Sequence, residues 1–153
     1  MVRRMSNLSM AQLLFPEIDK TPEDYEKMYP ARNLPEGAKV TRFAPSPTGF
    51  LHFGSLFAAF ISAKTAGNDG VFYLRIEDTD KKREVENGVI GMVNGLKDFG
   101  LVPDEGAMSE TEESGEYGPY TQSRRTAIYQ AYVKSLVEQG LAYPCFMTEQ
   151  EIA

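Results

Sequence analysis

The chain has 153 residues, of which 42% are hydrophobic and 25% are charged, and this composition excludes a disordered or collagen-like protein. Its net charge of -6 at pH 7 argues at first against a nucleic-acid partner. Residues 101–120 hold six acidic and no basic side chains, so this segment accounts for the imbalance. The single cysteine, Cys145, excludes an internal disulfide, and no apolar run reaches the roughly 18 residues of a membrane span. We therefore expect a cytoplasmic protein that has no membrane partner.

The first 37 residues are expected to form a helical N-terminal extension that ends in a linker. Thr21 is a suitable N-cap, Pro22 a suitable first helical residue, and Asp24 the acid of a capping box. Prolines and a glycine then interrupt the end of this segment, which is typical of a linker. The sequence therefore predicts two parts, residues 1–37 and residues 38–153.

Strands and helices are predicted to alternate in the second part. Val40–Ala44 is strand-like, and the apolar residues after it follow the period of an amphipathic helix that ends at Gly67. Val71–Glu77 alternates apolar and polar side chains, as a strand does, and a second apolar helix ends at Gly100. The two helical stripes consist of Phe53, Leu56, Phe57, Phe60 and Ile61, and of Val85, Val89, Met92, Val93, Leu96 and Phe99.

The acidic segment 101–120 contains prolines and glycines and is predicted to be a loop. A third helix follows and ends at Gly140, and Leu141–Phe146 has the pattern of a further strand. We interpret Tyr129 and Tyr132 of this helix as core or interface residues, not as a surface on which bases stack. Strands that alternate with helices at this spacing favour right-handed crossovers and a parallel, doubly wound α/β sheet.

The turn after the first predicted strand has features of a phosphate site. In an open α/β sheet, ligands lie beyond the carboxyl ends of the strands. Residues 45–55 lead from such an end into the first turn of a helix, whose free N–H groups and dipole favour a phosphate. Gly54 lets a ligand approach the backbone, and His52 can donate a hydrogen bond to phosphate oxygens. A lone histidine at a helix start is more often a surface residue, so this interpretation depends on the surrounding motif.

Charged residues near the two strand ends indicate an amino-acid site. Arg42 lies inside the first strand, where burial is costly unless the guanidinium meets an anion, and Glu77 ends the second strand. Together they suit a zwitterion, with Arg42 binding a carboxylate and Glu77 an ammonium group; a structural ion pair between them is the alternative. Asp78 and Asp80 are either metal ligands or, as we prefer, part of the N-cap of a helix that opens with residues 81–83.

Three stretches of the sequence together resemble the catalytic domain of bacterial glutamyl-tRNA synthetases. They are residues 42–55 (RFAPSPTGFLHFGS), 75–80 (RIEDTD) and 118–123 (GPYTQS), and the resemblance extends over about residues 38–150. It implies the N-terminal half of a class I, Rossmann-type domain, which ends where an acceptor-stem insertion begins. It also implies an enzyme that activates L-glutamate with ATP and Mg²⁺ as glutamyl-adenylate and transfers the glutamyl group to tRNA(Glu).

The resemblance also implies roles for individual residues. His52, Gly54 and Ser55 correspond to the His-Ile-Gly-His-type signature and are the candidate catalytic residues. The candidate ATP-binding residues are Pro45, Thr48, His52, Gly54 and Ser55, and the candidate glutamate-binding residues are Arg42, Ala44, Ser46 and Glu77. No residue is assigned to a metal. Arg124 and Arg125 are interpreted as solvated charges, and contact with the tRNA backbone is the alternative.

The sequence departs from the family pattern at three places. Ser55 replaces the second histidine of the signature. Cys145 is not followed by the second cysteine that many relatives have, and because one thiolate cannot hold a structural zinc ion, we expect no zinc. The chain reaches Ala153 without a counterpart of the family's lysine-containing ATP loop, so we expect it to be weakly active or inactive alone. The full-length protein is expected to be a monomer, whereas the isolated chain is expected to self-associate through its uncovered sheet.

Two other functions fit the same residues. A paralogue that attaches glutamate to queuosine in tRNA also resembles this domain, although the long extension and the missing cysteine pair argue against it. A nucleotide- or tRNA-binding module without catalytic activity is the other alternative. Because the excess acidic charge lies in residues 101–120, tRNA is expected to approach the protein elsewhere.

Overall fold

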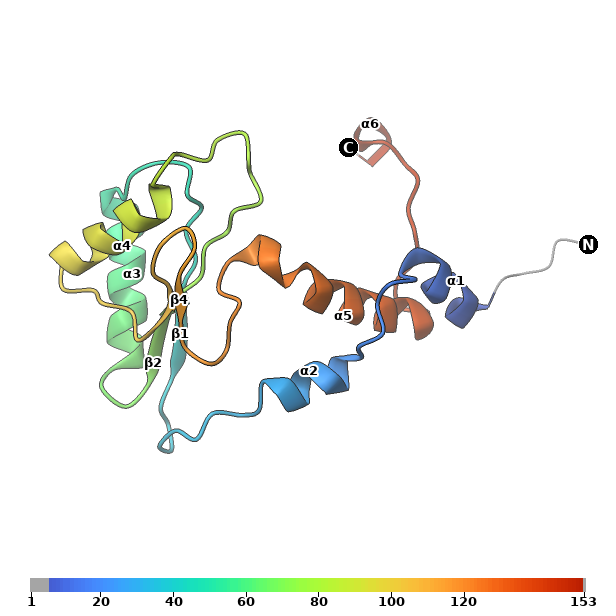
Figure 1. Cartoon of the computed structure of the whole chain (residues 1–153), viewed down its shortest axis with the longest axis horizontal. Coiled ribbons are helices and arrows are strands. Elements are labelled where there is room, and N and C mark those ends of the chain that lie inside the picture. Colours follow the sequence, from blue (N-terminus) through green and yellow to red (C-terminus); the bar gives the residue numbers. More distant parts are fainter. Residues whose placement is uncertain (1–5, 153) are drawn as a thin grey trace, which may run out of the picture. The chain divides into compact units, whose positions relative to one another are not determined.

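The computed structural model describes residues 6–152, and the chain divides into two compact units. One unit consists of the described residues up to Met28 together with those from Thr126 onward, and the other consists of Tyr29–Arg125. Figure 1 shows the helices and strands of both units. Within the described residues, no helix is long and apolar enough to cross a membrane.

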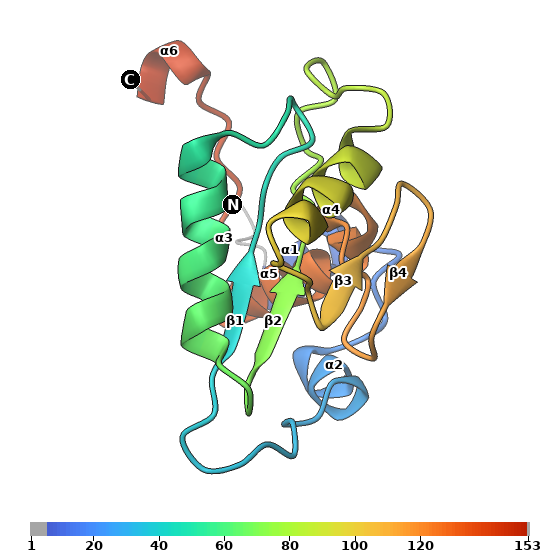
Figure 2. The same ribbon diagram turned by 90° about the vertical axis from the view of Figure 1, so that its left-hand side faces the viewer.

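The unit Tyr29–Arg125 is built on a four-stranded sheet with the order β1-β2-β3-β4. The strands are β1 (Val40–Phe43), β2 (Val71–Leu74), β3 (Glu105–Ala107) and β4 (Glu113–Ser114). The first three are parallel, and β4 returns antiparallel to β3. Helices α3 (Phe53–Ala66) and α4 (Gly88–Asp98) connect β1 to β2 and β2 to β3 (Figure 2). The predicted alternation of strands and helices is therefore confirmed from β1 to α4.

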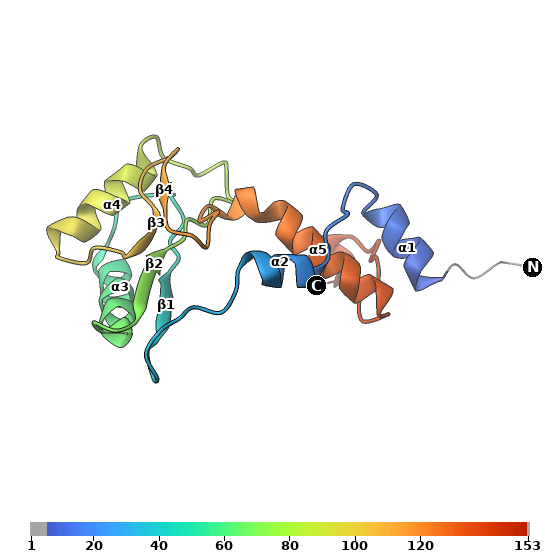
Figure 3. The ribbon, with the colours of Figure 1, turned by 60° about the horizontal axis from the view of Figure 1, so that its bottom comes forward.

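Both α3 and α4 lie on the same face of this sheet (Figure 3). Phe72 and Leu74 of β2 are buried in one cluster with Ala59 of α3 and with Val93 and Leu96 of α4. Because side chains alternate along a strand, the residues of β1 and β2 between these positions point to the opposite face. The core thus occupies one side of the sheet, and Arg42 of β1 and Tyr73 of β2 lie on the other.

The apolar stripe predicted for α3 has the period of the observed helix but not the expected burial. Phe53 and Phe57 are 84% and 57% exposed, whereas Ala59 and Ala66 are buried. Small side chains bring the helix backbone close to the sheet, so the larger ones are left on the outer face. Together with Phe99, the aromatic residues of this face line an apolar hollow of about 200 Å³.

Helix α4 begins later than the sequence predicts. Its N-cap is Asn87, with φ 58°, and residues 81–83 form a turn, so the expectation that they open a helix is wrong. The Glu110 side chain accepts hydrogen bonds from the first free amides of the helix, at 3.0 Å from Val89 N. The helix ends before Gly100, as predicted, and this glycine has φ 69°.

The segment 101–120 is more than the loop that the sequence predicts, because it contains β3 and β4. The prediction was wrong because acidic residues flank the short apolar stretch and because Gly106 is a poor strand former. Gly106 has φ 133°, and a Cβ atom at this position would lie 2.2 Å from the carbonyl oxygen of Leu74. Its missing side chain is therefore what lets β3 pair with β2.

The other unit consists of helices. They are α1 (Asn7–Leu14), α2 (Pro22–Met28), α5 (Thr126–Glu138) and α6 (Glu149–Ile152), and both α1 and α2 contact α5. The capping box of α2 is confirmed, since Thr21 N donates to Asp24 at 2.9 Å and Asp24 N donates to the Thr21 hydroxyl at 3.3 Å. The ammonium group of Lys134 donates to the carbonyl of Ile18 at 2.6 Å and joins α5 to the segment before α2.

The C-terminal part lacks its predicted strand, and its two tyrosines are not core residues, so their role at an interface stays a prediction. Residues 141–146 form no strand. The third predicted helix is present as α5, but Tyr129 and Tyr132 are exposed, and the buried residues of this helix are Ile128, Ala131 and Val137. Here the smaller residues again lie in the contact. Gly140 follows the helix with φ 74°, as the predicted end requires.

Candidate nucleotide and amino-acid site

Residues 44–52 connect the end of β1 to the start of α3 and contain most of the candidate site residues. Two backbone hydrogen bonds hold this turn in place. Glu77 N donates to the carbonyl of Pro45, and Val85 N donates to that of Pro47, both at 2.9 Å. The Pro47 side chain is fully buried. The turn is therefore anchored by its prolines and by its backbone, which leaves the polar side chains around them available.

His52 is the N-cap of α3. Its Nδ1 accepts a hydrogen bond from Ser55 N at 3.4 Å, in place of the hydroxyl or carboxylate that is common at this position. Because Nδ1 is an acceptor here, the proton of the neutral ring lies on Nε2. His52 is exposed, so this N–H is available to a ligand. A Cβ atom at Gly54 would contact only the His52 ring, at 3.1 Å, so the first turn of the helix is open on this side.

A hollow of about 340 Å³ lies between this turn and the start of α3. Five of the candidate residues line it, namely Pro45, Ser46, Thr48, His52 and Ser55. Phe43 and Met92 also line the hollow, and the sequence did not single them out as site residues. Both belong to predicted apolar elements, and their position near the turn is the signal that could have identified them as residues of the hollow. The hollow combines apolar groups with hydroxyls and an imidazole, and it lies at the N-terminus of a helix.

Arg42 and Glu77 do not form the ion pair that was the alternative reading. The Glu77 carboxylate instead accepts a hydrogen bond from Arg75 Nη2 at 2.8 Å. Arg42 is exposed, so its guanidinium avoids the cost that burial inside the strand would bring. The physical reason is its position on β1, which pairs only with β2 among the described strands, with Arg42 in register with Tyr73. The group therefore remains solvated and is available to an anion.

Asp78 connects the second motif (residues 75–80) to the third (residues 118–123). It is only 5% exposed, and it accepts hydrogen bonds from Ser123 N at 2.8 Å, from the Ser123 hydroxyl at 2.5 Å and from Lys81 Nζ at 2.8 Å. Burial opposes ionisation, but the hydrogen bonds from Lys81 and Ser123 outweigh it and lower the pKa of Asp78. The residue is thus neither the predicted N-cap nor one of a metal-binding group among the described side chains.

The third motif is held by residues that the sequence did not single out. Glu113 accepts hydrogen bonds from Tyr120 N and Thr121 N, both at 3.0 Å, and from the Thr121 hydroxyl at 2.9 Å. Ile76 N in turn donates to the carbonyl of Tyr120 at 2.9 Å. The three motifs therefore meet at the carboxyl ends of β1 and β2, the first joined to the second through the Pro45 carbonyl.

Three parallel strands joined by crossover helices, with a helix that starts beyond the end of the first strand, define a Rossmann-type α/β domain. Residues 39–153 match the model of the class I tRNA synthetases (E and Q), catalytic domain. This match covers most of the chain, so the chain belongs to that family. The fold class predicted from the sequence is confirmed.

Similar proteins agree with this assignment. A glutamate–tRNA ligase from Clostridium perfringens strain 13 is 54% identical over 149 residues, which are 97% of this chain and 27% of that protein. One from Bacillus subtilis strain 168 is 47% identical over 112 residues, 72% of this chain and 22% of that protein. The chain spans about a quarter of the length of these curated relatives.

A solved structure agrees as well. It is the crystal structure of a glutamate tRNA ligase from Elizabethkingia meningosepticum in complex with its amino acid. The two chains are 40% identical and superpose with a TM-score of 0.65 over 76% of this chain and 22% of that one. At this level of identity, the likeness extends to the sequence as well as the fold.

Proposed function

We propose that this chain carries the first half of the ATP and glutamate site of a glutamate–tRNA ligase. In this reaction a carboxylate oxygen of L-glutamate attacks the α-phosphorus of ATP, pyrophosphate leaves, and the glutamyl group then passes from the adenylate to the terminal adenosine of tRNA(Glu). The observation that carries the proposal is the meeting of the three motifs at the strand ends, in a chain that belongs to the family.

ATP is proposed to bind in the hollow at the start of α3. The free amides of the first helical turn and His52 Nε2–H would donate to its phosphate oxygens, and Thr48 and Ser55 would add hydroxyl groups. Developing charge on the phosphates then meets donors that are already oriented, which is the usual source of rate enhancement in phosphate chemistry. ATP would enter as its Mg²⁺ complex, because this ion is commonly held by the substrate phosphates together with few protein groups.

Glutamate is proposed to bind on the face of the sheet opposite α3. Arg42 would bind one of its carboxylates and Glu77 its ammonium group, with Ala44 and Ser46 as neighbours. Arg75 holds the Glu77 carboxylate at 2.8 Å and so fixes its direction. The proposal is supported by the position of Arg42 on β1 and of Glu77 shortly after β2, the strand that pairs with β1.

The test is exchange of labelled pyrophosphate into ATP that depends on L-glutamate and tRNA(Glu), measured on the longest form of the protein that its gene encodes. We expect exchange with glutamate and none with glutamine. Absence of exchange in that protein, with ATP binding retained, would favour a binding module without catalysis. Transfer of glutamate to tRNA that lacks its terminal adenosine would instead favour the queuosine-modifying activity.

The remaining proposals concern the state of the protein. We infer that it works in the cytoplasm, as an enzyme that acts on tRNA does, that the full-length protein is a monomer and that residues 1–37 are an extension of the domain that begins at residue 38. The absence of a structural zinc ion stays a prediction, which rests on Cys145 being the single cysteine. Elemental analysis of the purified protein tests it.

We further propose that the isolated 153-residue chain self-associates through the exposed aromatic face of α3. Phe53, Phe57 and Phe60 give this face its apolar character, and β1 at the edge of the described sheet lies beside α3. Sedimentation velocity should show oligomers whose fraction falls in Phe57→Ser. The control is Phe146→Ser, which changes an exposed phenylalanine of the other unit. A monomer at all concentrations would contradict the proposal.

A further inference from the structure

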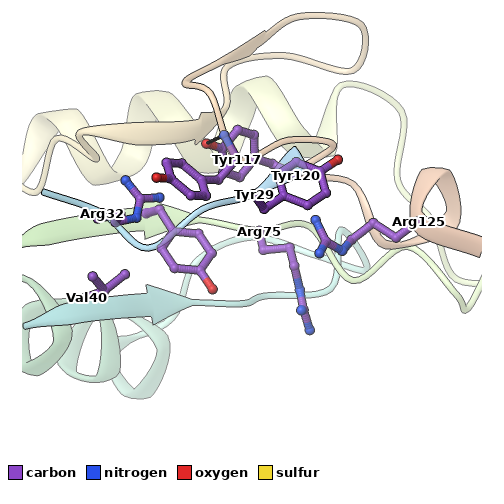
Figure 4. Close-up of a pocket in the computed structure, with 8 residues that line it drawn as sticks. Tyr29, Arg32, Val40, Arg75, Tyr117, Tyr120 and Arg125 are labelled. Carbon is purple, nitrogen blue, oxygen red and sulfur yellow. Dashed lines mark hydrogen bonds between the residues drawn. The ribbon is translucent and has the colours of Figure 1, made fainter. Parts of the chain in front are cut away.

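A second hollow of about 250 Å³ lies on the face of the sheet opposite α3 and α4 (Figure 4). It is lined by Tyr29, Arg32, Val40, Tyr73, Arg75, Tyr117, Tyr120 and Arg125, all of which belong to the unit Tyr29–Arg125. None of these residues lines the hollow at the start of α3. Three arginines and four tyrosines around one small space make a cationic, aromatic pocket. The proposed function uses only one of them, Arg75, and only through its bond to Glu77.

One end of the pocket is already neutralised. Glu105 accepts two hydrogen bonds from the Arg32 guanidinium, at 2.5 and 2.6 Å, and a third from the Tyr120 hydroxyl at 2.7 Å. Burial and the bond to Glu105 raise the pKa of Tyr120 to about 12, so its hydroxyl stays protonated and keeps donating. The Tyr117 hydroxyl donates to the carbonyl of Pro30 at 2.9 Å. The carboxylate and these hydroxyls are therefore committed to one another.

The other end of the pocket has donors without acceptors. Arg75 gives one Nη2 hydrogen bond to Glu77, and Arg125 gives one Nη1 hydrogen bond to the carbonyl of Pro119 at 2.7 Å. The Nε atoms of both arginines are buried, and neither has a hydrogen-bond partner among the residues that the structure describes. A buried donor without an acceptor destabilises the fold, and a bound acceptor would remove this cost.

The charges do not balance either. Three guanidinium groups line the pocket, and the carboxylates bonded to them are Glu105 and Glu77. The structure thus leaves one positive charge in excess, at the end where the free N–H groups lie. Figure 4 shows Arg75 and Arg125 at this end and Arg32 at the other. A single negative group would satisfy both the charge and the donors.

We propose that this pocket binds a small oxyanion, a phosphate or a carboxylate, between the guanidinium groups of Arg75 and Arg125. A planar guanidinium presents parallel N–H groups that match two oxygens of either anion. Tyr29 and Arg32 supply one wall of the pocket from the segment before β1, where Arg32 lies 3.7 Å from the centre of the Tyr117 ring. The end of the N-terminal extension is thereby part of a binding site and does more than link two parts of the chain.

The direct test follows the Nε–Hε resonances of the arginines in the 153-residue chain by nitrogen-15 NMR. Inorganic phosphate and, separately, acetate are titrated at constant ionic strength. The site is supported if the Arg75 and Arg125 resonances shift saturably with either anion, and the anion that saturates at lower concentration identifies the chemistry. Arg83, which is exposed and paired with Asp80, is the internal control and should not saturate. Shifts with neither anion, or equal linear shifts of all arginines, would overturn the proposal.

A thermal measurement complements the spectra. The saturating anion should raise the melting temperature of the wild-type chain, and Arg125→Gln should abolish this increase while Arg83→Gln keeps it. If Arg125→Gln does not fold, Arg125→Lys retains the charge without the fork and should bind the anion about tenfold more weakly. An unchanged anion effect in the Arg125 variant would refute a site at this position.

Discussion

The turn at residues 44–55 and the acidic segment at residues 101–120 both connect the sheet to other elements, and both are rich in proline or glycine. Their side chains are used in opposite ways. In the turn, backbone groups make the hydrogen bonds that the structure shows, apart from the one between Ser55 N and His52. In the acidic segment, carboxylates add to the backbone hydrogen bonds of β3 and β4, since Asp104 accepts from Phe72 N at 2.8 Å and Glu113 binds residues 120 and 121.

This difference separates residues that hold the fold from residues that are free to bind a ligand. Acidic side chains suggested a solvated loop that repels tRNA, but Glu105, Glu110 and Glu113 are bonded to groups within the same unit. The polar side chains of the turn, by contrast, line a hollow. The acidic residues that give the chain its net charge of -6 therefore stabilise the fold, and the charge says little about which partner the chain binds.

The largest effect on stability is expected at Glu105, which accepts three hydrogen bonds in the acidic segment. Glu105→Gln removes the charge that faces Arg32, and both side chains of this pair are 16% exposed. A guanidinium left partly buried without its partner should lower the free energy of unfolding by about 3 kcal/mol, measured by urea denaturation. Glu116→Gln, an exposed neighbour in the same segment, should change it by less than about 0.5 kcal/mol. Equal losses in the two variants would show that the segment is not held by Glu105.

In the turn at residues 44–55, we expect a substitution that lowers activity without lowering stability. His52→Asn keeps a side chain that can cap α3 but removes the imidazole, so pyrophosphate exchange should fall about a hundredfold, whereas the free energy of unfolding should change by less than about 0.5 kcal/mol. His52→Ala removes both functions and should also lose about 1 kcal/mol of stability. Exchange at the wild-type rate in His52→Asn would mean that the histidine only caps the helix.

A smaller effect is expected from acid. The pKa of Asp78 is lowered in the folded protein, so the unfolded chain takes up its proton first as the pH falls. Its contribution is therefore complete above about pH 4 and is lost as the pH falls through the lower, folded value. Between pH 7 and pH 2, the free energy of unfolding should fall less in Asp78→Asn than in the wild type. The control Asp69→Asn, at an exposed position, should retain the wild-type slope.

Local signals in the sequence predicted much of the fold. The capping box at Thr21, the ends of the helices at Gly67 and Gly100, and the strands around Val40 and Val71 depend on neighbouring residues, and all are present. These features do not depend on distant contacts, so the local sequence is enough to predict them.

Features that depend on distant contacts could not be read in this way. The period of α3 is visible in the sequence, but which face it buries depends on how closely Ala59 approaches the sheet. β3 exists because Gly106 fits against Leu74, and the burial of Asp78 depends on Ser123, 45 positions away. For the site, the motifs predicted which residues gather at the strand ends, but not that Arg75, rather than Arg42, holds Glu77.

The central claim is that the turn binds ATP while the acidic segment holds the fold, and hydrogen exchange of the backbone amides with and without Mg²⁺-ATP tests it most directly. We predict that ATP slows exchange in residues 44–56, which include the first turn of α3, and leaves residues 101–120 unchanged. Slowed exchange in residues 101–120, or no change in residues 44–56 at saturating ATP, would contradict the account.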